Sequence, residues 1–240
     1  MGFDLVDHET AFARISEWIR RHQRHYVAVA NPHSVLLCRR DPDMGLAIRQ
    51  AGLVLPDGVG ITLAARMLGL PHRGRVTGPM FMLNACDWGR QFGHRHFFYG
   101  GRPGVADRLA GRLVQAFPGL QVAGTYCPPF RDMSDREQED TASRMNASRP
   151  DVVWVGLGAP KQEKWMLHNA SRIDVPVMVG VGAAFDFHSG NVRWAPAMIR
   201  HLGLEWAFRL LAEPKRLWRR NLDNFPFLMA VLKQRFRGQM

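Results

Sequence analysis

The amino-acid sequence predicts an α/β fold, in which a mostly parallel sheet has helices on both faces, followed by a basic helical C-terminal appendage. Short apolar runs alternate with helix-forming patterns over residues 1–192, and three of these runs end directly in glycine turns. Residues 193–240, by contrast, contain no strand-like run. Repeated strand, glycine turn and helix units are typical of a Rossmann-like sheet, so we assign 1–192 to the core and 193–240 to the appendage.

The expected elements follow one another along the core. The first strand is "YVAVAN" (26–31), and "DPDMGLAIRQAG" (41–52) is predicted as a capped helix. "LVLPDGVGI" (53–61) is a strand that ends in a glycine turn, and "GITLAARMLG" (60–69) is helical. The later segments repeat this pattern: "HFFYGGRPGVADRLAGRLVQAFP" (96–118), "LQVAGTY" (120–126), "DREQEDTASRMNASRPDVVWVGLG" (135–158) and "VPVMVGVGAAFDF" (175–187). In such sheets, ligands bind at the carboxyl ends of the strands.

Composition limits the possible partners. The 240 residues carry 32 Lys or Arg against 21 Asp or Glu, a formal charge of +11, which indicates an anionic partner such as a phosphorylated ligand, nucleic acid or an acidic membrane surface. The three cysteines are far apart and match no metal-ligand spacing, so we expect reduced thiols. The N-terminal segment does not resemble a signal peptide, and no apolar run is long enough to span a bilayer.

Three glycine turns are candidate ligand sites. They are "YGGRPG" (99–104), "GLGAPKQE" (156–163) and "GVGAAFD" (180–186), with Gly100, Gly101, Gly158 and Gly182 at their centres. Glycine lets backbone N–H groups approach a ligand closely, and a following helix N-terminus favours phosphate. None completes a dinucleotide fingerprint, because Lys161 and Phe185 occupy the place of the third glycine. For each turn alone a simple tight connection is the better interpretation, but three such turns in one sheet favour a nucleotide-type ligand.

Polar residues follow the first two strands. Asp57, before Gly58, either caps the next helix or provides a carboxylate for general-base chemistry at the ligand edge of the sheet. Asn31 is either a turn residue or an amide that orients a hydroxyl. The sequence leaves both pairs of alternatives open. Asp41 and Asp43 of "DPD" precede a helix and are interpreted as helix-capping residues, so we expect no metal site.

The appendage is rich in arginine and tryptophan. From Glu213 onward it has seven Lys or Arg residues against two acids, interleaved with Trp218, Phe225 and Phe227. Such a segment could bind nucleic acid or lie on an anionic membrane, and composition does not separate the two.

In sequence order, the blocks "VAN", "PDG", "RVTG", "FYGGRPG", "GLGAPKQE", "GVGAAFDFHSG", "RWAP" and "GLEWAFRLLAEPKRLWRR" resemble the WecG/TagA/CpsF family of bacterial glycosyltransferases. The resemblance runs from about residue 27 to about residue 222. It implies inverting, metal-independent transfer of a sugar such as N-acetylmannosamine from a UDP-sugar to a polyprenyl-diphosphate-linked sugar, with no cofactor. The product would belong to a teichoic acid, common antigen, capsule or exopolysaccharide.

The resemblance also assigns roles to residues. It implies that Asp57 is the general base, with Asn31 beside it, and that Gln162 lies at the donor pocket. Arginines of the appendage would bind the diphosphate. The substrate-binding residues expected on this basis are Gly58, Arg75, Gly78, Gly100, Gly101, Gly158, Pro160, Gln162, Glu163, Gly182, Phe185, Asp186, Arg209, Arg216 and Arg219.

Two positions depart from the family pattern. Val29 replaces a threonine of the T-x-N block, and Pro79 and Met80 follow "RVTG", where the family often carries an acid. Both changes imply a possible difference in the sugar selected. A dinucleotide-dependent oxidoreductase, from the sheet pattern, and a nucleic-acid-binding module, from the charge, are the alternative functions. The leading hypothesis predicts a cytoplasmic protein, peripheral on the inner face of the plasma membrane, with no nucleic-acid partner; a homo-oligomer is possible.

Overall fold

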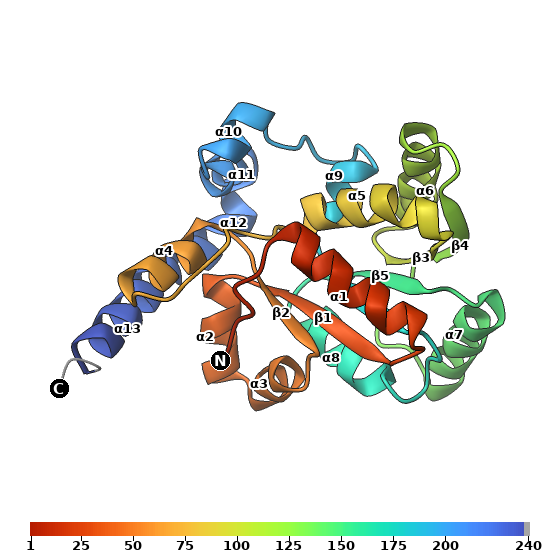
Figure 1. The fold of residues 1–240 in the computed structure, drawn as a ribbon, viewed down its shortest axis with the longest axis horizontal. Coiled ribbons are helices and arrows are strands. Elements are labelled where there is room, and N and C mark those ends of the chain that lie inside the picture. Colours follow the sequence, from red (N-terminus) through yellow and green to blue (C-terminus); the bar gives the residue numbers. More distant parts are fainter. Residues whose placement is uncertain (238–240) are drawn as a thin grey trace.

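Six parallel strands form one sheet in the order β2-β1-β6-β5-β3-β4 (Figure 1). The structure is a computed structural model that describes residues 1–237, without the side chains of Arg216, Arg219, Arg220 and Arg237. The strands are β1 (His25–Ala30), β2 (Leu53–Pro56), β3 (Arg95–Gly100), β4 (Gln121–Tyr126), β5 (Val152–Gly156) and β6 (Val177–Gly180). The α/β fold with a parallel sheet is therefore confirmed. Because the chain runs outward from β1 to β2 and later returns to β6 on the other side of β1, the strand order reverses beside β1, where ligands bind in such sheets.

Helices cover both faces of the sheet. One core cluster joins Phe98 and Trp154 to α1 (His8–Arg20), α5 (Gly78–Trp88), α6 (Val105–Ala116) and α9 (Ala184–His188). On the opposite face, Tyr99, Val155 and Met178 pack with Met145 of α7 (Asp135–Ser148) and Met166 of α8 (Lys161–Asn169). Ala28 and Val54 of that face pack against α3 (Pro42–Arg49). Burial on both sides explains why the strands are continuous apolar runs. The 3-10 helix η1 (Gly89–Phe92) connects α5 to β3.

Capping explains several helix starts. Asp41 accepts hydrogen bonds from the backbone N–H groups of Asp43 and Met44 and begins α3, which confirms the helix-cap interpretation of "DPD". Ser134 and Glu137 form a capping box at α7. At α4 (Val59–Met67), however, the N-cap position is occupied by Gly58, which has no side chain to cap the helix. Asp57 lies one residue before this N-cap position.

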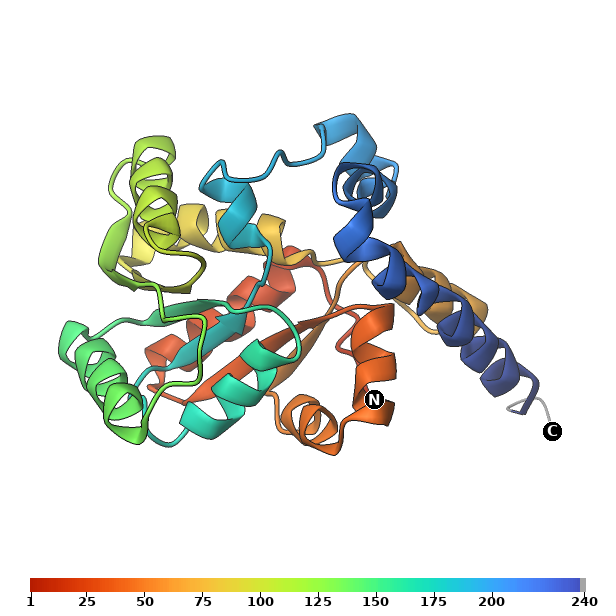
Figure 2. The ribbon, with the colours of Figure 1, turned by 180° about the vertical axis from the view of Figure 1, so that it is seen from behind.

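The last four helices are α10 (Ala197–His201), α11 (Glu205–Ala212), α12 (Pro214–Leu222) and α13 (Asn224–Arg237). Helix α13 lies alongside α4 in both views, and Phe227 and Val231 pack with Leu36 of α2 (Pro32–Arg40) and Ile61 of α4 (Figures 1 and 2). Between α12 and α13, Asp223 binds His33 Nδ1 at 2.6 Å and Arg40 Nη2 at 2.9 Å. The appendage is thus docked on the core. Among residues 1–237, no helix is both long enough and apolar enough to cross a bilayer.

Candidate active site

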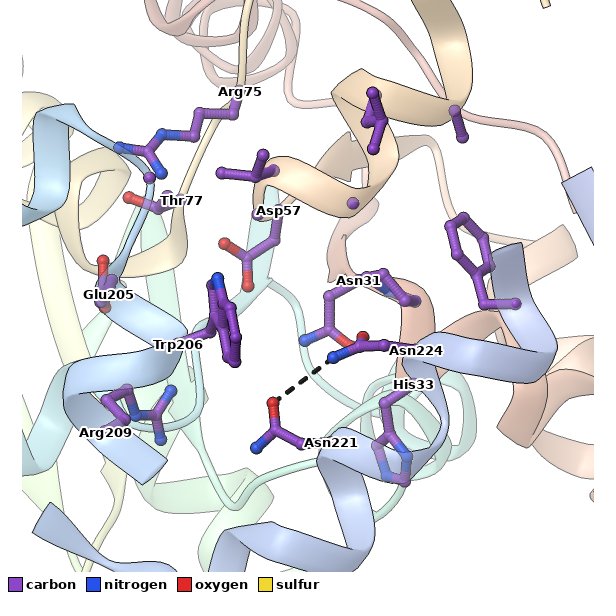
Figure 3. Close-up of a pocket in the computed structure, with 18 of the residues that line it drawn as sticks. Asn31, His33, Asp57, Arg75, Thr77, Glu205, Trp206, Arg209, Asn221 and Asn224 are labelled. Carbon is purple, nitrogen blue, oxygen red and sulfur yellow. Dashed lines mark hydrogen bonds between the residues drawn. The ribbon is translucent and has the colours of Figure 1, made fainter. Parts of the chain in front are cut away.

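A cavity of about 330 Å³ lies at the carboxyl edge of the sheet, between the strand ends and the appendage (Figure 3). The core side is lined by Asn31, Pro32, His33, Asp57, Gly58, Val59, Gly60, Leu63, Ala64, Arg75 and Thr77. The appendage side is lined by Gly203, Glu205, Trp206, Arg209, Leu217, Asn221, Asn224, Phe227 and Leu228. A mostly apolar pocket with a few convergent polar groups is the usual form of a small-ligand site.

Asp57 lies on the floor of this cavity. Its backbone N–H donates to Ala30 O at 2.9 Å, which ties the end of β2 to the end of β1. Gly58 then adopts a φ of +82°, a conformation that strongly favours glycine, and turns the chain into α4. The turn leaves the Asp57 carboxylate facing the cavity beside Trp206 (Figure 3). A carboxylate held at this edge can act as a base toward a bound hydroxyl.

Asn31 caps a helix and also lines the cavity. Its Oδ1 accepts from Ser34 N at 3.3 Å as the N-cap of α2, so it is a capping residue. Its side chain also lines the cavity, and its Nδ2 group points into it (Figure 3). The cap therefore fixes the amide in the direction needed to donate to a ligand oxygen.

Arg75 lines the cavity opposite Asn31, and its guanidinium donates to the carbonyl of Arg200 in α10. This contact ties the core wall to the appendage. Gly78, in contrast, is buried at the start of α5, where an added Cβ would lie 3.2 Å from Val181 O. It allows close packing beneath the site and does not line the cavity.

A second cavity of about 530 Å³ adjoins the first and shares His33, Arg209 and Leu217 with it. Its remaining lining residues are Arg40, Gly156, Ala159, Gly182, Ala183, Asp186 and Asp223. The glycine turns after β5 and β6 form its wall, so Gly182 and Asp186, both predicted to bind substrate, line this cavity. Together, the two cavities form one cleft along the sheet edge.

Gln162 is buried behind these turns, with a relative exposure of 4 %. Its Oε1 accepts from Gly158 N at 3.2 Å and from Gly182 N at 3.0 Å, and its Nε2 donates to Glu163 Oε1 at 2.8 Å. One side chain thus joins the two turns, while the buried Glu163 braces it. Neither cavity is lined by Gln162, Glu163 or Pro160. Gln162 and Glu163 support the wall from behind, and Pro160 is the N-cap residue of α8.

The turn after β3 packs against the core. A Cβ on Gly100 would lie 2.6 Å from Gly156 C, and one on Gly101 would lie 2.7 Å from Val105 Cγ1. Gly100 allows the turn after β5 to approach, Gly101 allows close packing on the start of α6, and neither lines the two cavities. Phe185 is likewise buried, edge-on to Phe98, beneath Gly156. These three predicted positions contact the site only indirectly.

Arg209 of α11 lies where the two cavities meet. Its guanidinium carbon is 5.2 Å from the centre of the Phe187 ring, and its buried Nε has no hydrogen-bond partner among the described residues. A guanidinium oriented in this way can bind phosphate oxygens. Arg216 and Arg219, also predicted to bind substrate, have side chains that lie outside the described part of α12.

Trp206, Asn221 and Asn224 line the cavity without having been predicted to do so. A signal for them existed: Leu217, Asn221, Asn224 and Leu228 are spaced by three or four residues, which places them along one side of consecutive helical turns. The sequence did not show which partner that side faces. Within residues 1–237, no three His, Cys, Asp or Glu side chains gather as a metal site would require.

The whole chain, residues 1–240, matches the profile of the Glycosyl transferase WecG/TagA/CpsF family. A relative from Bacillus spizizenii is 33% identical over 96% of this chain and 88% of its own length. A Bacillus subtilis relative is 26% identical over 92% and 88%, and one from Staphylococcus aureus is 27% identical over 88% and 82%. All three are named N-acetylglucosaminyldiphosphoundecaprenol N-acetyl-beta-D-mannosaminyltransferase.

Proposed function

The chain belongs to the WecG/TagA/CpsF family of glycosyltransferases, and from this premise we propose that it transfers a sugar from a UDP-sugar to a polyprenyl-diphosphate-linked sugar. The names of its relatives specify N-acetylmannosaminyl transfer to N-acetylglucosaminyl diphosphoundecaprenol. An N-acetylmannosamine-like donor sugar and this acceptor are our first choice. The product is a cell-surface polysaccharide. The family match gives no support to an oxidoreductase or a nucleic-acid-binding module.

The position of Asp57 is the observation that carries the proposal. Its carboxylate faces the cavity at the junction of β1 and β2, with Asn31 next to it (Figure 3). In the proposed reaction, Asp57 takes the proton of the acceptor hydroxyl while that oxygen attacks the anomeric carbon of the donor sugar. The bond from this carbon to the UDP oxygen breaks as the new glycosidic bond forms. A single displacement inverts the anomeric configuration, and it needs only one carboxylate on the attacking side.

The donor diphosphate belongs, on this proposal, in the cavity formed by the glycine turns. Arg209 and Arg40 line that cavity, and the turns after β5 and β6 place backbone close to a ligand. Negative charge that develops on the leaving UDP can be met by guanidinium groups. Because these residues supply positive charge themselves, we propose a metal-independent transfer.

The acceptor is a membrane lipid, so the enzyme must work at the membrane surface. Appendage side chains near the cavity are both apolar and exposed, among them Leu222, Phe225 and Met229. An excess of basic residues in the same segment favours an anionic leaflet. We therefore propose a peripheral location on the cytoplasmic face of the plasma membrane.

The test is release of UDP from UDP-sugars in the presence of a lipid-diphosphate-N-acetylglucosamine analogue. Asp57→Asn is expected to lower kcat by about a hundredfold or more, since a general base contributes 10²–10⁴-fold. Donor KM and the melting temperature should stay close to those of the unmodified enzyme. Full activity of Asp57→Asn would remove Asp57 as the base. Absence of transfer by the unmodified enzyme with every UDP-sugar tried would contradict the proposed function itself.

A further inference from the structure

Trp206 is a large aromatic side chain that the fold of the core does not require. It is 51% exposed, yet it lines the cavity and projects from α11 beside the Asp57 carboxylate (Figure 3). The start of α11 is held in place because Trp194 Nε1 donates to Glu205 Oε1 at 3.4 Å, and Arg200 stacks on Trp194 at 3.8 Å. The indole is therefore presented to the cavity by an anchored helix.

Amide groups occupy the wall across from this ring. Asn221 Nδ2 donates to Leu217 O at 2.9 Å, and its Oδ1 accepts from Asn224 Nδ2 at 3.4 Å. Because Asn224 Nδ2 donates to Asn221, the carbonyl oxygen of Asn224 is the atom of this amide that can accept a hydrogen bond from a ligand. From the core side, Asn31 offers its Nδ2 group as a donor (Figure 3). The cavity thus has one flat aromatic wall and a rim of amide donors and acceptors.

This combination matches a pyranose ring. One face of such a ring is made of C–H groups that pack on an aromatic surface, and its edge is made of hydroxyl and amide groups that need hydrogen-bond partners. An aromatic wall alone would accept any apolar group, while the amides reject a ligand that leaves them unpaired. Both features occur in the same cavity as the proposed base.

The neighbourhood of the cavity indicates which of the two sugars it holds. Its lining includes the apolar Leu63, Phe227 and Leu228, and the exposed Phe225 and Met229 directly follow the lining residues Asn224 and Leu228 on α13. The adjoining cavity instead has the glycine turns and the guanidinium of Arg209, which suit a diphosphate, whereas its Arg40 is paired with Asp223. Only the acceptor sugar is linked to a lipid, so only the acceptor needs an apolar continuation.

We propose that Trp206 and Asn224 form the acceptor-sugar subsite, with Trp206 stacked on the pyranose face and Asn224 bound to its rim. This proposal rests on the proposed function. It makes both residues determinants of acceptor affinity and specificity, and it places the attacking hydroxyl beside Asp57.

The first test is steady-state kinetics with a water-soluble acceptor, N-acetylglucosaminyl diphosphate linked to a short alkyl chain. Trp206→Ala is expected to raise acceptor KM by about tenfold, equal to 1.4 kcal/mol, and to leave donor KM within about twofold. Trp206→Phe should restore most of the affinity because a flat ring remains. Phe130→Ala removes another exposed aromatic, 77% exposed and absent from both cavity linings, and should change neither KM.

A second probe separates the sugar from the rest of the acceptor. An alkyl diphosphate without a sugar should inhibit the unmodified enzyme, Trp206→Ala and Asn224→Ala equally, since it has no ring to contact either residue. Asn224→Ala should raise acceptor KM about fivefold, within the 0.5–1.5 kcal/mol that one hydrogen bond contributes.

Three results would overturn the subsite: an unchanged acceptor KM in Trp206→Ala, a donor KM that rises by the same factor, or weaker inhibition by the sugarless probe. Activity of the unmodified enzyme is measured in the same assay. If the unmodified enzyme is active and the variants have unchanged acceptor KM values, the subsite alone is refuted. If the unmodified enzyme is inactive, both the proposed function and the subsite are refuted.

Discussion

Gln162 links two glycine turns through a single oxygen, although it touches neither cavity. The N–H groups of Gly158 and Gly182 both donate to it, and they belong to the turns after adjacent strands. Because Gln162 lines neither cavity, we interpret it as a positioning residue that holds the wall of the second cavity, where we propose that the donor diphosphate binds. The family resemblance found the residue, and the hydrogen bonds show how it could act.

Gln162→Ala would leave both N–H groups without this acceptor and open a buried space. We expect UDP affinity to decrease by about tenfold or more, together with a lower melting temperature, because unpaired buried donors cost 1–3 kcal/mol each. Titration calorimetry with UDP measures the loss. Lys161→Ala, at an exposed neighbouring position on α8, is the matched control. Equal UDP affinity in Gln162→Ala and the control would dismiss the positioning role.

His188 is a buried histidine at the base of the appendage. Its Nε2 lies 2.9 Å from Pro79 O, so the neutral ring donates there, and burial lowers its pKa from the ordinary 6.5 to about 4. Between these values the unfolded chain binds a proton that the folded protein does not. Stability from this group is therefore present above about pH 6.5 and is lost as the pH falls toward about 4.

His188→Gln keeps an N–H donor but does not titrate. Between about pH 7.5 and about pH 5.5, the unmodified protein should lose about 1.4 kcal/mol more unfolding free energy than the variant. Urea denaturation at the two pH values measures both. Equal losses in the two proteins would mean that His188 gains its proton without cost in the folded state.

At the scale of elements, Asp223 attaches the α12–α13 junction to α2. Burial alone would raise the pKa of Asp223, but the hydrogen bonds from His33 and Arg40, together with the charges of these two residues, outweigh it and lower this pKa. The lowered pKa means that this stabilisation is present at neutral pH and is lost as the pH falls through the acidic range. The contact spans 190 residues of sequence.

Asp223→Asn removes the charge with little change of shape. We expect faster amide exchange in α13, by about tenfold, since hydrogen bonds to charged groups contribute 1.5–3 kcal/mol. Hydrogen–deuterium exchange mass spectrometry on peptides from residues 214–237 reports it. Asp43→Asn, an exposed carboxylate on α3, serves as the control. Unchanged exchange in α13 would show that the apolar contacts of Phe227 and Val231 suffice to dock this helix.

At the scale of the whole molecule, the cleft lies next to the basic helix α13 with its exposed apolar side chains. This arrangement suits a lipid-linked acceptor. The glycine turns form one end of the cleft, and α13 extends beyond the other (Figure 2). A membrane-bound enzyme of this shape would place its catalytic edge at the lipid surface. The net charge of +11 would add attraction to anionic headgroups.

The double variant Phe225→Glu with Met229→Glu tests this arrangement. Both side chains are exposed and lie outside the two cavities. We expect binding to anionic liposomes to decrease by about tenfold or more, because apolar area and charge both contribute to interfacial binding. Turnover of the water-soluble acceptor should be retained. Liposome sedimentation equal to that of the unmodified protein would contradict a membrane role for α13.

Local sequence patterns alone determined the type of sheet, the edge at which Asp57 lies and the helix cap at Asp41. The apolar runs and glycine turns predicted a parallel sheet, and Asp57 was placed at its ligand edge because the carboxyl ends of parallel strands share one edge. The cap at Asp41 was likewise local. These features depend on residues close in sequence, so spacing and residue type are enough to identify them.

Tertiary packing alone decided how the site is completed. The appendage folds back over the strand ends and supplies Trp206, Arg209 and Asn224 to a cavity whose floor is Asp57. Packing also turned Gln162 behind the wall and buried Phe185 beneath it. Contacts such as that between His33 and Asp223 join positions far apart in the chain, and no local pattern encodes them, because they form only where apolar burial brings those segments together.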